Sequence, residues 1–101
     1  MRSITITYQY DGDEAVWHSE IDRFINALNN DPDIAAKFSY QVSIADDDKT
    51  RIHWGRWDNA ETLSHVQTQD YFKTFAAQVR VFSGNGPGAT VTNVVAKTDS
   101  W

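Results

Sequence analysis

The first ten residues alternate between apolar and polar side chains. The apolar positions on one face are Ile4, Ile6, Tyr8 and Tyr10. The other face carries two threonines and a glutamine. A period of two, with β-branched residues on both faces, predicts a half-buried β-strand over residues 3–10. The same alternation differs from the continuous apolar run of a signal peptide.

A helical period replaces this alternation after the Asp-Gly-Asp turn at residues 11–13. The apolar side chains now recur at intervals of three and four, at Trp17, Ile21, Phe24, Ile25 and Leu28. This spacing predicts an amphipathic helix that lies on a sheet and is capped by Asp11 or Asp13. We expect the helix to end before Pro32, because proline disfavours helical geometry in the residue that precedes it.

Two further strands are predicted after this helix, over residues 37–45 and 50–57. The acidic run at 46–49 predicts a turn between them, so that the two strands form a hairpin. Asp58 is predicted to cap a second helix, because Glu61 three residues later completes a capping-box-like pattern.

The second helix is predicted to continue to Phe82, and the polar residues 68–70 favour an interruption within it. A glycine-containing loop at 83–88 separates it from a last predicted strand at 89–97. The loop follows a helix and precedes a strand, which is the reverse of a phosphate-binding loop. We therefore interpret it as a connection.

The predicted order β-α-β-β-α-β is that of a ferredoxin-like α+β domain spanning residues 1–101. Its four-stranded antiparallel sheet would carry two helices on one face. The uncovered face would present Thr5, Thr7, Gln9, Ser39, Gln41 and Ser43. Because this face is too β-branched for an ordinary solvent face, we expect two copies to pack through it. The expected assembly is a homodimer that closes a dimeric α+β barrel.

Composition narrows the possible functions. The 101 residues carry a net charge of −5, so nucleic acid and anionic membranes are not expected partners. The absence of cysteine excludes disulfides, thiolate catalysis and cysteine-based metal sites. We predict a cytoplasmic protein. Aromatic residues make up 13% of the chain, and we expect some to line a pocket or a subunit interface.

Residues 38–75 resemble the antibiotic biosynthesis monooxygenase family of dimeric α+β barrels. The resemblance rests on a strand that ends in Trp57, a helix that leads to His65, and a polar step into a Phe-Lys-x-Phe segment beginning at Phe72. The interval from Trp57 to His65 is one residue shorter than the family pattern. The family's haem-degrading branch has a histidine just after its Phe-Lys pair. Here Thr74, Phe75, Ala76 and Ala77 follow, so we exclude haem degradation.

The resemblance implies a cofactor-independent monooxygenase that acts on, or binds, a small aromatic or polyketide-like molecule. In such enzymes the substrate is deprotonated and its anion reacts with dioxygen. The protein would supply a base, a dry aromatic pocket and a hydrogen bond to the developing oxyanion. His65 and His53 are the candidate bases, because the ordinary pKa of histidine lies near neutrality. A helix-surface or interface position fits His65 somewhat better than a catalytic one, and His53 fits equally well as a cross-strand partner in the dimer.

Trp57 is the expected pocket wall, with core packing as the equal alternative. Tyr40, Asn59 and Tyr71 complete the candidate substrate-binding set. Core packing is the commoner role of a strand tyrosine such as Tyr40, and the helix start explains Asn59 equally well. Asn59 and Tyr71 are candidate donors of hydrogen bonds to a substrate oxygen.

No cofactor or metal is expected, because no histidine and carboxylate set has metal-ligand spacing. Two other functions remain open at this point. One is a non-catalytic small-molecule-binding or stress-related barrel protein, and the other is a structural dimerisation module. The lining of the pocket would separate the three functions, because an enzyme needs a titratable group turned into the cavity and a scaffold needs no cavity at all.

Overall fold

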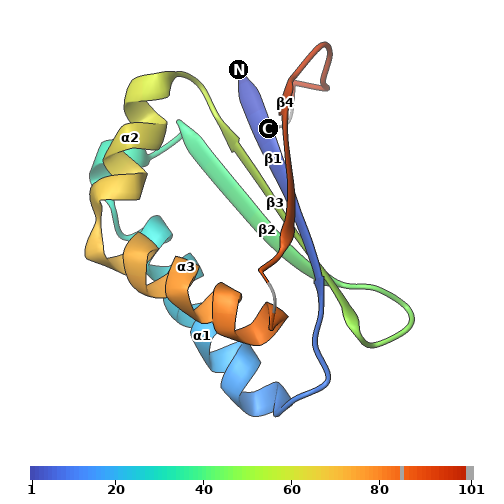
Figure 1. Ribbon diagram of the computed structural model, residues 1–101. Helices are drawn as coiled ribbons and strands as arrows, with labels where there is room; N and C mark the ends of the chain where they lie inside the picture. Colours follow the sequence, from blue (N-terminus) through green and yellow to red (C-terminus); the bar gives the residue numbers. More distant parts are fainter. Residues whose placement is uncertain (85, 100–101) are drawn as a thin grey trace.

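The computed structural model describes residues 1–84 and 86–99, and these form two layers (Figure 1). One layer is a four-stranded antiparallel sheet with the strand order β2-β3-β1-β4. The helices form the other layer and cover one face of the sheet (Figure 1). In chain order the elements are β1 (Arg2–Gln9), α1 (Glu14–Asn29), the 3₁₀ helix η1 (Pro32–Ile34), β2 (Phe38–Ile44), β3 (Thr50–Trp57), α2 (Ala60–Thr68), α3 (Asp70–Ser83) and β4 (Gly88–Asn93). The predicted ferredoxin-like α+β fold is confirmed.

The strands agree closely with their predicted ranges except at the C-terminal end of β4. The prediction of 89–97 was too long, since β4 ends at Asn93. The sheet explains this end, because Asn93 pairs with Arg2 and β1 begins there. One more backbone hydrogen bond, from Val94 N to Met1 O at 3.1 Å, marks the limit of pairing.

The first helix begins where its cap was predicted. The Asp13 side chain accepts a hydrogen bond from the backbone N–H of Val16 at 3.2 Å, which satisfies one free donor of the first turn. The helix ends at Asn29, ahead of Pro32 as expected. The short η1 turn at Pro32–Ile34 was not predicted.

The second predicted helix is divided at Gln69, whose extended backbone (ψ 144°) separates α2 from α3. The interruption favoured by residues 68–70 is thus confirmed. The predicted cap of α2 was wrong by one residue. Asn59 is the N-cap, and its Oδ1 accepts from the backbone N–H groups of Glu61 and Thr62 at 3.0 and 3.1 Å. Asp58 instead accepts from the hydroxyl of Thr62.

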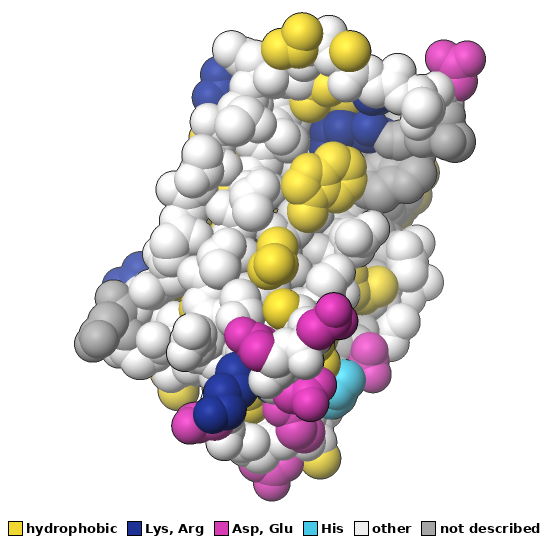
Figure 2. Space-filling view, turned by 90° about the vertical axis from the view of Figure 1, so that its right-hand side faces the viewer, with side chains coloured by type: hydrophobic (Ala, Val, Ile, Leu, Met, Phe, Trp, Pro, Cys, Tyr) yellow, Lys and Arg dark blue, Asp and Glu magenta, His cyan; other side chains and the backbone are white. Residues whose placement is uncertain are grey.

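The strand register separates the side chains into two faces. Ile6 pairs with His53 and Tyr40 pairs with Gly55, so these positions lie on the face that the helices cover. The polar residues predicted for the uncovered face have the opposite parity. Figure 2 shows that face as largely uncharged, with acidic side chains gathered at its lower end.

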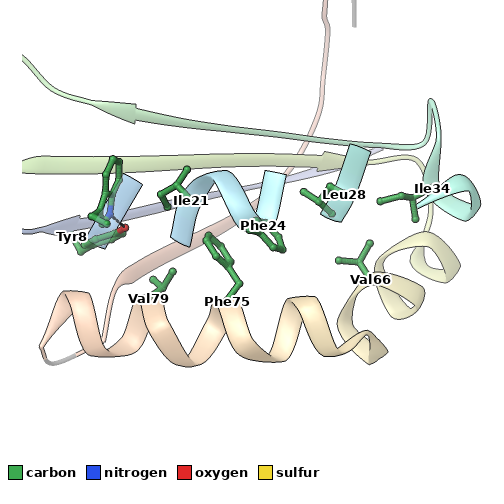
Figure 3. Packing of buried hydrophobic residues seen from close by; sticks show 9 residues of the cluster. Tyr8, Ile21, Phe24, Leu28, Ile34, Val66, Phe75 and Val79 are labelled. Carbon is green, nitrogen blue, oxygen red and sulfur yellow. Dashed lines mark hydrogen bonds between the residues drawn. The ribbon is translucent and has the colours of Figure 1, made fainter. Parts of the chain in front are cut away.

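The hydrophobic core lies between the sheet and the helices (Figure 3). At its centre the rings of Phe24 on α1 and Phe75 on α3 are stacked, with centroids 3.7 Å apart and planes 4° apart. The buried residues of this cluster are Tyr8, Trp17, Ile21, Phe24, Leu28, Ile34, Val66, Phe75 and Val79. Within the described residues, no helix is both long enough and apolar enough to cross a membrane.

Candidate functional site

A cavity of about 610 Å³ lies between the sheet and the helices α2 and α3. Its size is within the range of small-molecule sites. Small side chains, Ala60 on α2 and Ala76 on α3, occupy positions in its wall and leave the space open. The apolar part of the lining includes Ile4, Ile6, Phe38, Leu63, Phe72 and Phe75. An aromatic or other flat apolar molecule would be desolvated here.

Polar groups border this apolar space without any acidic side chain. Arg2, Asn59, Gln67 and Arg80 lie in the wall, and among the described lining residues there is neither Asp, Glu nor His. The Arg2 guanidinium donates to Asn93 Oδ1 at 3.1 Å, and Arg80 is exposed. Two cations with no opposing carboxylate in the lining favour an anionic or strongly electron-rich ligand.

Trp57 stands in the cavity wall, at the end of β3, where sequence reasoning expected a pocket wall. Its side chain is 4% exposed, and its indole lies nearly parallel to the ring of Phe38, with centroids 6.4 Å apart. Asn59 also lies in the wall while it caps α2. The cap uses the Asn59 carbonyl oxygen, so the amide N–H groups remain available to a ligand.

Tyr40 lines the cavity too, and its hydroxyl contacts a buried chain of polar groups. Its oxygen lies 2.8 Å from His53 Nδ1, and His53 Nε2 lies 2.8 Å from the hydroxyl of Tyr8. Trp17 Nε1 donates to the same Tyr8 oxygen at 2.9 Å. The Tyr40 ring lies over Gly55, where an added Cβ would be 3.0 Å from the ring. Any other residue at this position of β3 would require the Tyr40 ring to shift by a few tenths of an ångström.

His53, one of the two candidate bases, is fully buried and is not part of the cavity lining. Burial lowers its pKa to about 4, so the imidazole is neutral at pH 7. Both ring nitrogens already have hydrogen-bond partners. Its strand parity matches that of Trp57, and it faces the helix side of the sheet, not the uncovered face through which a dimer partner was expected.

His65 and Tyr71 lie together away from the cavity wall, around Asp31. His65 Nε2 is 2.9 Å from Asp31 Oδ2, and the Tyr71 hydroxyl donates to the same oxygen at 2.8 Å. Burial opposes ionisation of Asp31, but the hydrogen bonds from His65, Tyr71 and the Asp33 backbone outweigh it and lower the pKa of Asp31. Burial and the bond to Asp31 raise the pKa of Tyr71.

Asp31, Asp33 and His65 also place three ligand atoms within 4.8 Å of one another, the closest approach to a metal set in the described part of the chain. The contacts of His65 and Tyr71 with Asp31 Oδ2 hold Asp31 and His65 together.

The structure therefore brings Trp57, Tyr40 and Asn59 together at the cavity and leaves His53, His65 and Tyr71 outside it. Sequence reasoning missed Arg2 and Arg80. The signal for Arg80 was present, because it follows Phe72 and Ala76 at intervals of four, which places all three on one face of a helix.

No protein-family model matches the sequence, and no curated protein matches it. Solved structures do match along almost the whole chain. Rv0793 from Mycobacterium tuberculosis superimposes with a TM-score of 0.79 at 13% identity, covering 97% of this chain and 98% of its own. SnoaB from Streptomyces nogalater, a cofactor-independent oxygenase, gives a TM-score of 0.74 at 14% identity, with coverage of 98% and 97%. An antibiotic biosynthesis monooxygenase gives 0.72 at 10% identity, with coverage of 95% and 100%.

Identities this low show a shared fold and leave the chemistry to be argued from the site. The sheet order, the helices on one face and the near-complete coverage agree with the resemblance seen in the sequence. This chain has the fold of the antibiotic biosynthesis monooxygenase structures.

Proposed function

We propose that this chain binds a small aromatic phenol or enol as its anion in the cavity, and oxygenates it with dioxygen without a cofactor. The observation that carries the proposal is the lining of the 610 Å³ cavity, which is apolar apart from a few polar groups and has two arginines but no described carboxylate. SnoaB shares the fold and is a cofactor-independent oxygenase, which supports the same chemistry here.

The arginines would favour the reactive form of the ligand. A nearby guanidinium stabilises an anion and so lowers the pKa of a bound phenol or enol. Arg2 and Arg80 would thus let the ligand ionise without a histidine or carboxylate base in the wall. Trp57 and the apolar side chains would exclude water from the anion.

An anthrone illustrates the balance of the reaction. Its carbanion passes one electron to dioxygen, and the carbon radical and superoxide combine to form a C–O bond. A proton then completes a hydroperoxide. Loss of the remaining hydrogen on that carbon, with cleavage of the O–O bond, gives a carbonyl group and one water. One anthrone and one dioxygen therefore yield one anthraquinone and one water.

Binding without catalysis is the second candidate function. The observation that favours it is the lack of a histidine, aspartate or glutamate among the described lining residues, because a protein base is the usual means of ionising a substrate. Dioxygen uptake distinguishes the two functions, since a binding protein would retain the ligand unchanged.

The test is dioxygen consumption with anthrone, followed alongside anthraquinone formation. We expect one dioxygen consumed for each anthraquinone formed, at a rate above the reaction in buffer. Replacing both cavity arginines (Arg2→Gln and Arg80→Gln) should lower kcat/KM about tenfold or more, because each removes a charge near the anion. Lys73→Gln is the matched control, because Lys73 is an exposed cation of α3 outside the lining. Binding without uptake would leave the second candidate, and neither binding nor uptake would overturn both.

We further propose that the protein is a homodimer formed through the uncovered face of the sheet. The outward positions of the described strands carry one charged side chain, Arg56, which is 8% exposed and lies 5.6 Å from the ring of Trp54. The other outward positions are uncharged. Thr5 and Thr90, which pair across β1 and β4, are examples. A broad face with a single charge and several β-branched residues is suited to packing on another sheet.

Analytical ultracentrifugation at micromolar concentration tests the dimer. We expect a particle of twice the 11.5 kDa chain mass. Thr5→Lys should dissociate it, because a charge would be buried without a partner. Thr74→Lys, an exposed change on α3, should leave the mass unchanged. A wild-type monomer would contradict the proposal.

A further inference from the structure

The chain Trp17–Tyr8–His53–Tyr40 has one proton more than it has contacts, so one tyrosine hydroxyl is left without an acceptor within the chain. Trp17 Nε1 can only donate, and it donates to Tyr8 Oη at 2.9 Å. His53 is neutral, so one of its nitrogens carries a proton and the other accepts. Burial raises the pKa of both tyrosines, so each hydroxyl keeps its proton.

The hydrogen bonds between Tyr8, His53 and Tyr40 can then run in two directions. In the first, Tyr40 donates to His53 Nδ1 and Nε2–H donates to Tyr8. The Tyr8 proton then has no acceptor, because its other described neighbour, Trp17 Nε1, is a donor. Tyr8 is 6% exposed, so water cannot readily replace that acceptor. A buried hydroxyl without an acceptor is unfavourable.

In the second direction, Tyr8 donates to His53 Nε2, and His53 Nδ1–H donates to the Tyr40 oxygen. Every buried proton then has an acceptor. The proton that is left over belongs to Tyr40. Of the four residues, Tyr40 alone lines the cavity, so the residue that carries the unused proton is part of the cavity wall.

We infer that the Tyr40 hydroxyl is the hydrogen-bond donor that holds an oxygen of the ligand in the cavity, and that Trp17, Tyr8 and His53 orient it. The inference rests on the proposed function and specifies which atom recognises the ligand. His53 is a positioning residue, because it acts through Tyr40. Its donation to the Tyr40 oxygen also polarises the O–H bond and strengthens the bond that Tyr40 makes to an anion.

The same network defines the ligand more closely. A single O–H donor in an apolar wall, with arginines nearby, selects a molecule whose oxygen carries negative charge next to a flat ring system. Gly55 contributes to the position of Tyr40, since a Cβ at residue 55 would lie 3.0 Å from the Tyr40 ring and would require the ring to shift.

The first measurement is the position of the His53 proton, read by long-range ¹H–¹⁵N correlation NMR at pH 7. His18→Gln and His65→Gln variants assign the His53 signals by elimination, because those are the other two histidines. We expect the proton on Nδ1 and an unprotonated Nε2. A proton on Nε2, or a doubly protonated ring at pH 7, would overturn the inference whatever the ligand.

The second measurement is binding of two naphthoquinones of almost equal shape. The 2-hydroxy compound is an anion at neutral pH, and the 2-methoxy compound is neutral. Tyr40→Phe should weaken binding of the hydroxy compound about tenfold or more, and of the methoxy compound about threefold or less, because a hydrogen bond to a charged group is the stronger one. Tyr71→Phe is the matched control, because Tyr71 lies outside the lining.

The outcomes separate the two proposals. Equal effects of Tyr40→Phe on both compounds, or none on either, would overturn this inference and leave the proposed function standing. A wild-type protein that binds neither compound would overturn the proposed function and this inference with it.

Discussion

The space between sheet and helices is filled at one end and hollow at the other, and an arginine in each half shows the difference. Arg51 is fully buried in the filled half, between the rings of Trp17 and Tyr10 at 4.4 and 5.3 Å. Its guanidinium donates to Glu14 and to the backbone carbonyls of Tyr10, Lys49 and Asp48. Arg80 borders the hollow half and is exposed.

The difference shows that the fold uses polar groups for two purposes. No described buried side-chain nitrogen or oxygen is without a partner, and in the filled half the polar groups such as Arg51 stabilise the structure through these contacts. At the cavity, the amide of Asn59 and the guanidinium of Arg80 keep donors available. Groups with spare donors in an apolar wall are suited to binding a ligand.

The largest expected effect comes from replacing one large side chain in each half by alanine, in separate variants. Trp17→Ala in the filled half should lower the free energy of unfolding by about 3–5 kcal/mol, because it removes a large buried side chain and leaves a void beside Arg51. Phe72→Ala, at the partly buried cavity wall, should lower it by about 1–2 kcal/mol, since less packing is lost. Urea unfolding of both variants checks this. Equal losses would remove the distinction between the halves.

The pH dependence of stability tests the filled half in a second way. Burial lowers the pKa of His53 to about 4 from the value of 6.5 in the unfolded chain. Between these values the unfolded chain binds a proton that the folded chain does not. The contribution of neutral, buried His53 to the free energy of unfolding is therefore complete above pH 6.5 and is lost as the pH falls toward 4. We expect the free energy of unfolding to decrease by about 2–3 kcal/mol from pH 7 to 4.5.

Urea titrations at several pH values measure this slope. Asp47 does not interfere. Hydrogen bonds from the Thr50 side chain and from the Thr50 and Lys49 backbone lower its pKa to about 2, so its contribution is lost mainly below pH 3.8. A flat profile between pH 7 and 4.5 would show that His53 is solvated.

The smallest expected effect tests the role of Asn59 in the hollow half. Asn59→Ala removes the cap of α2 and should cost about 1 kcal/mol, whereas Asn59→Asp retains a cap oxygen and should cost little. Both changes remove the amide N–H groups from the cavity wall. Weaker naphthoquinone binding in both variants, with stability lost in the alanine variant only, would separate the capping role from the binding role. Unchanged binding would limit Asn59 to capping.

The fold was predictable from the sequence because its signals are local. The alternation at residues 3–10 predicts β1 to within one residue at each end, and the polar residues 68–70 mark the division between α2 and α3. The cap of α2 was missed by one residue because Asp58 and Asn59 are adjacent short acceptors. Only the direction in which the chain enters the helix decides between them.

The site was predictable only in part, since it depends on contacts between distant residues. Trp57, Tyr40 and Asn59 lie at the cavity because strand parity and the helix start place them there. His65 contacts Asp31, which is 34 residues away, and no local pattern contains that contact. The homodimer formed through the outward face of the sheet remains a prediction. The cytoplasmic location also remains a prediction.

Gly55 leaves room for a neighbour's side chain, and this has a consequence for reading natural variation in proteins of this shape. A residue that contributes no atoms beyond its backbone still determines where the Tyr40 phenol rests. Any substitution there would move a recognition group on the adjacent strand while the mutated position itself never meets a ligand. A survey of variants that scores residues by their own contacts would therefore overlook the position on which ligand recognition depends.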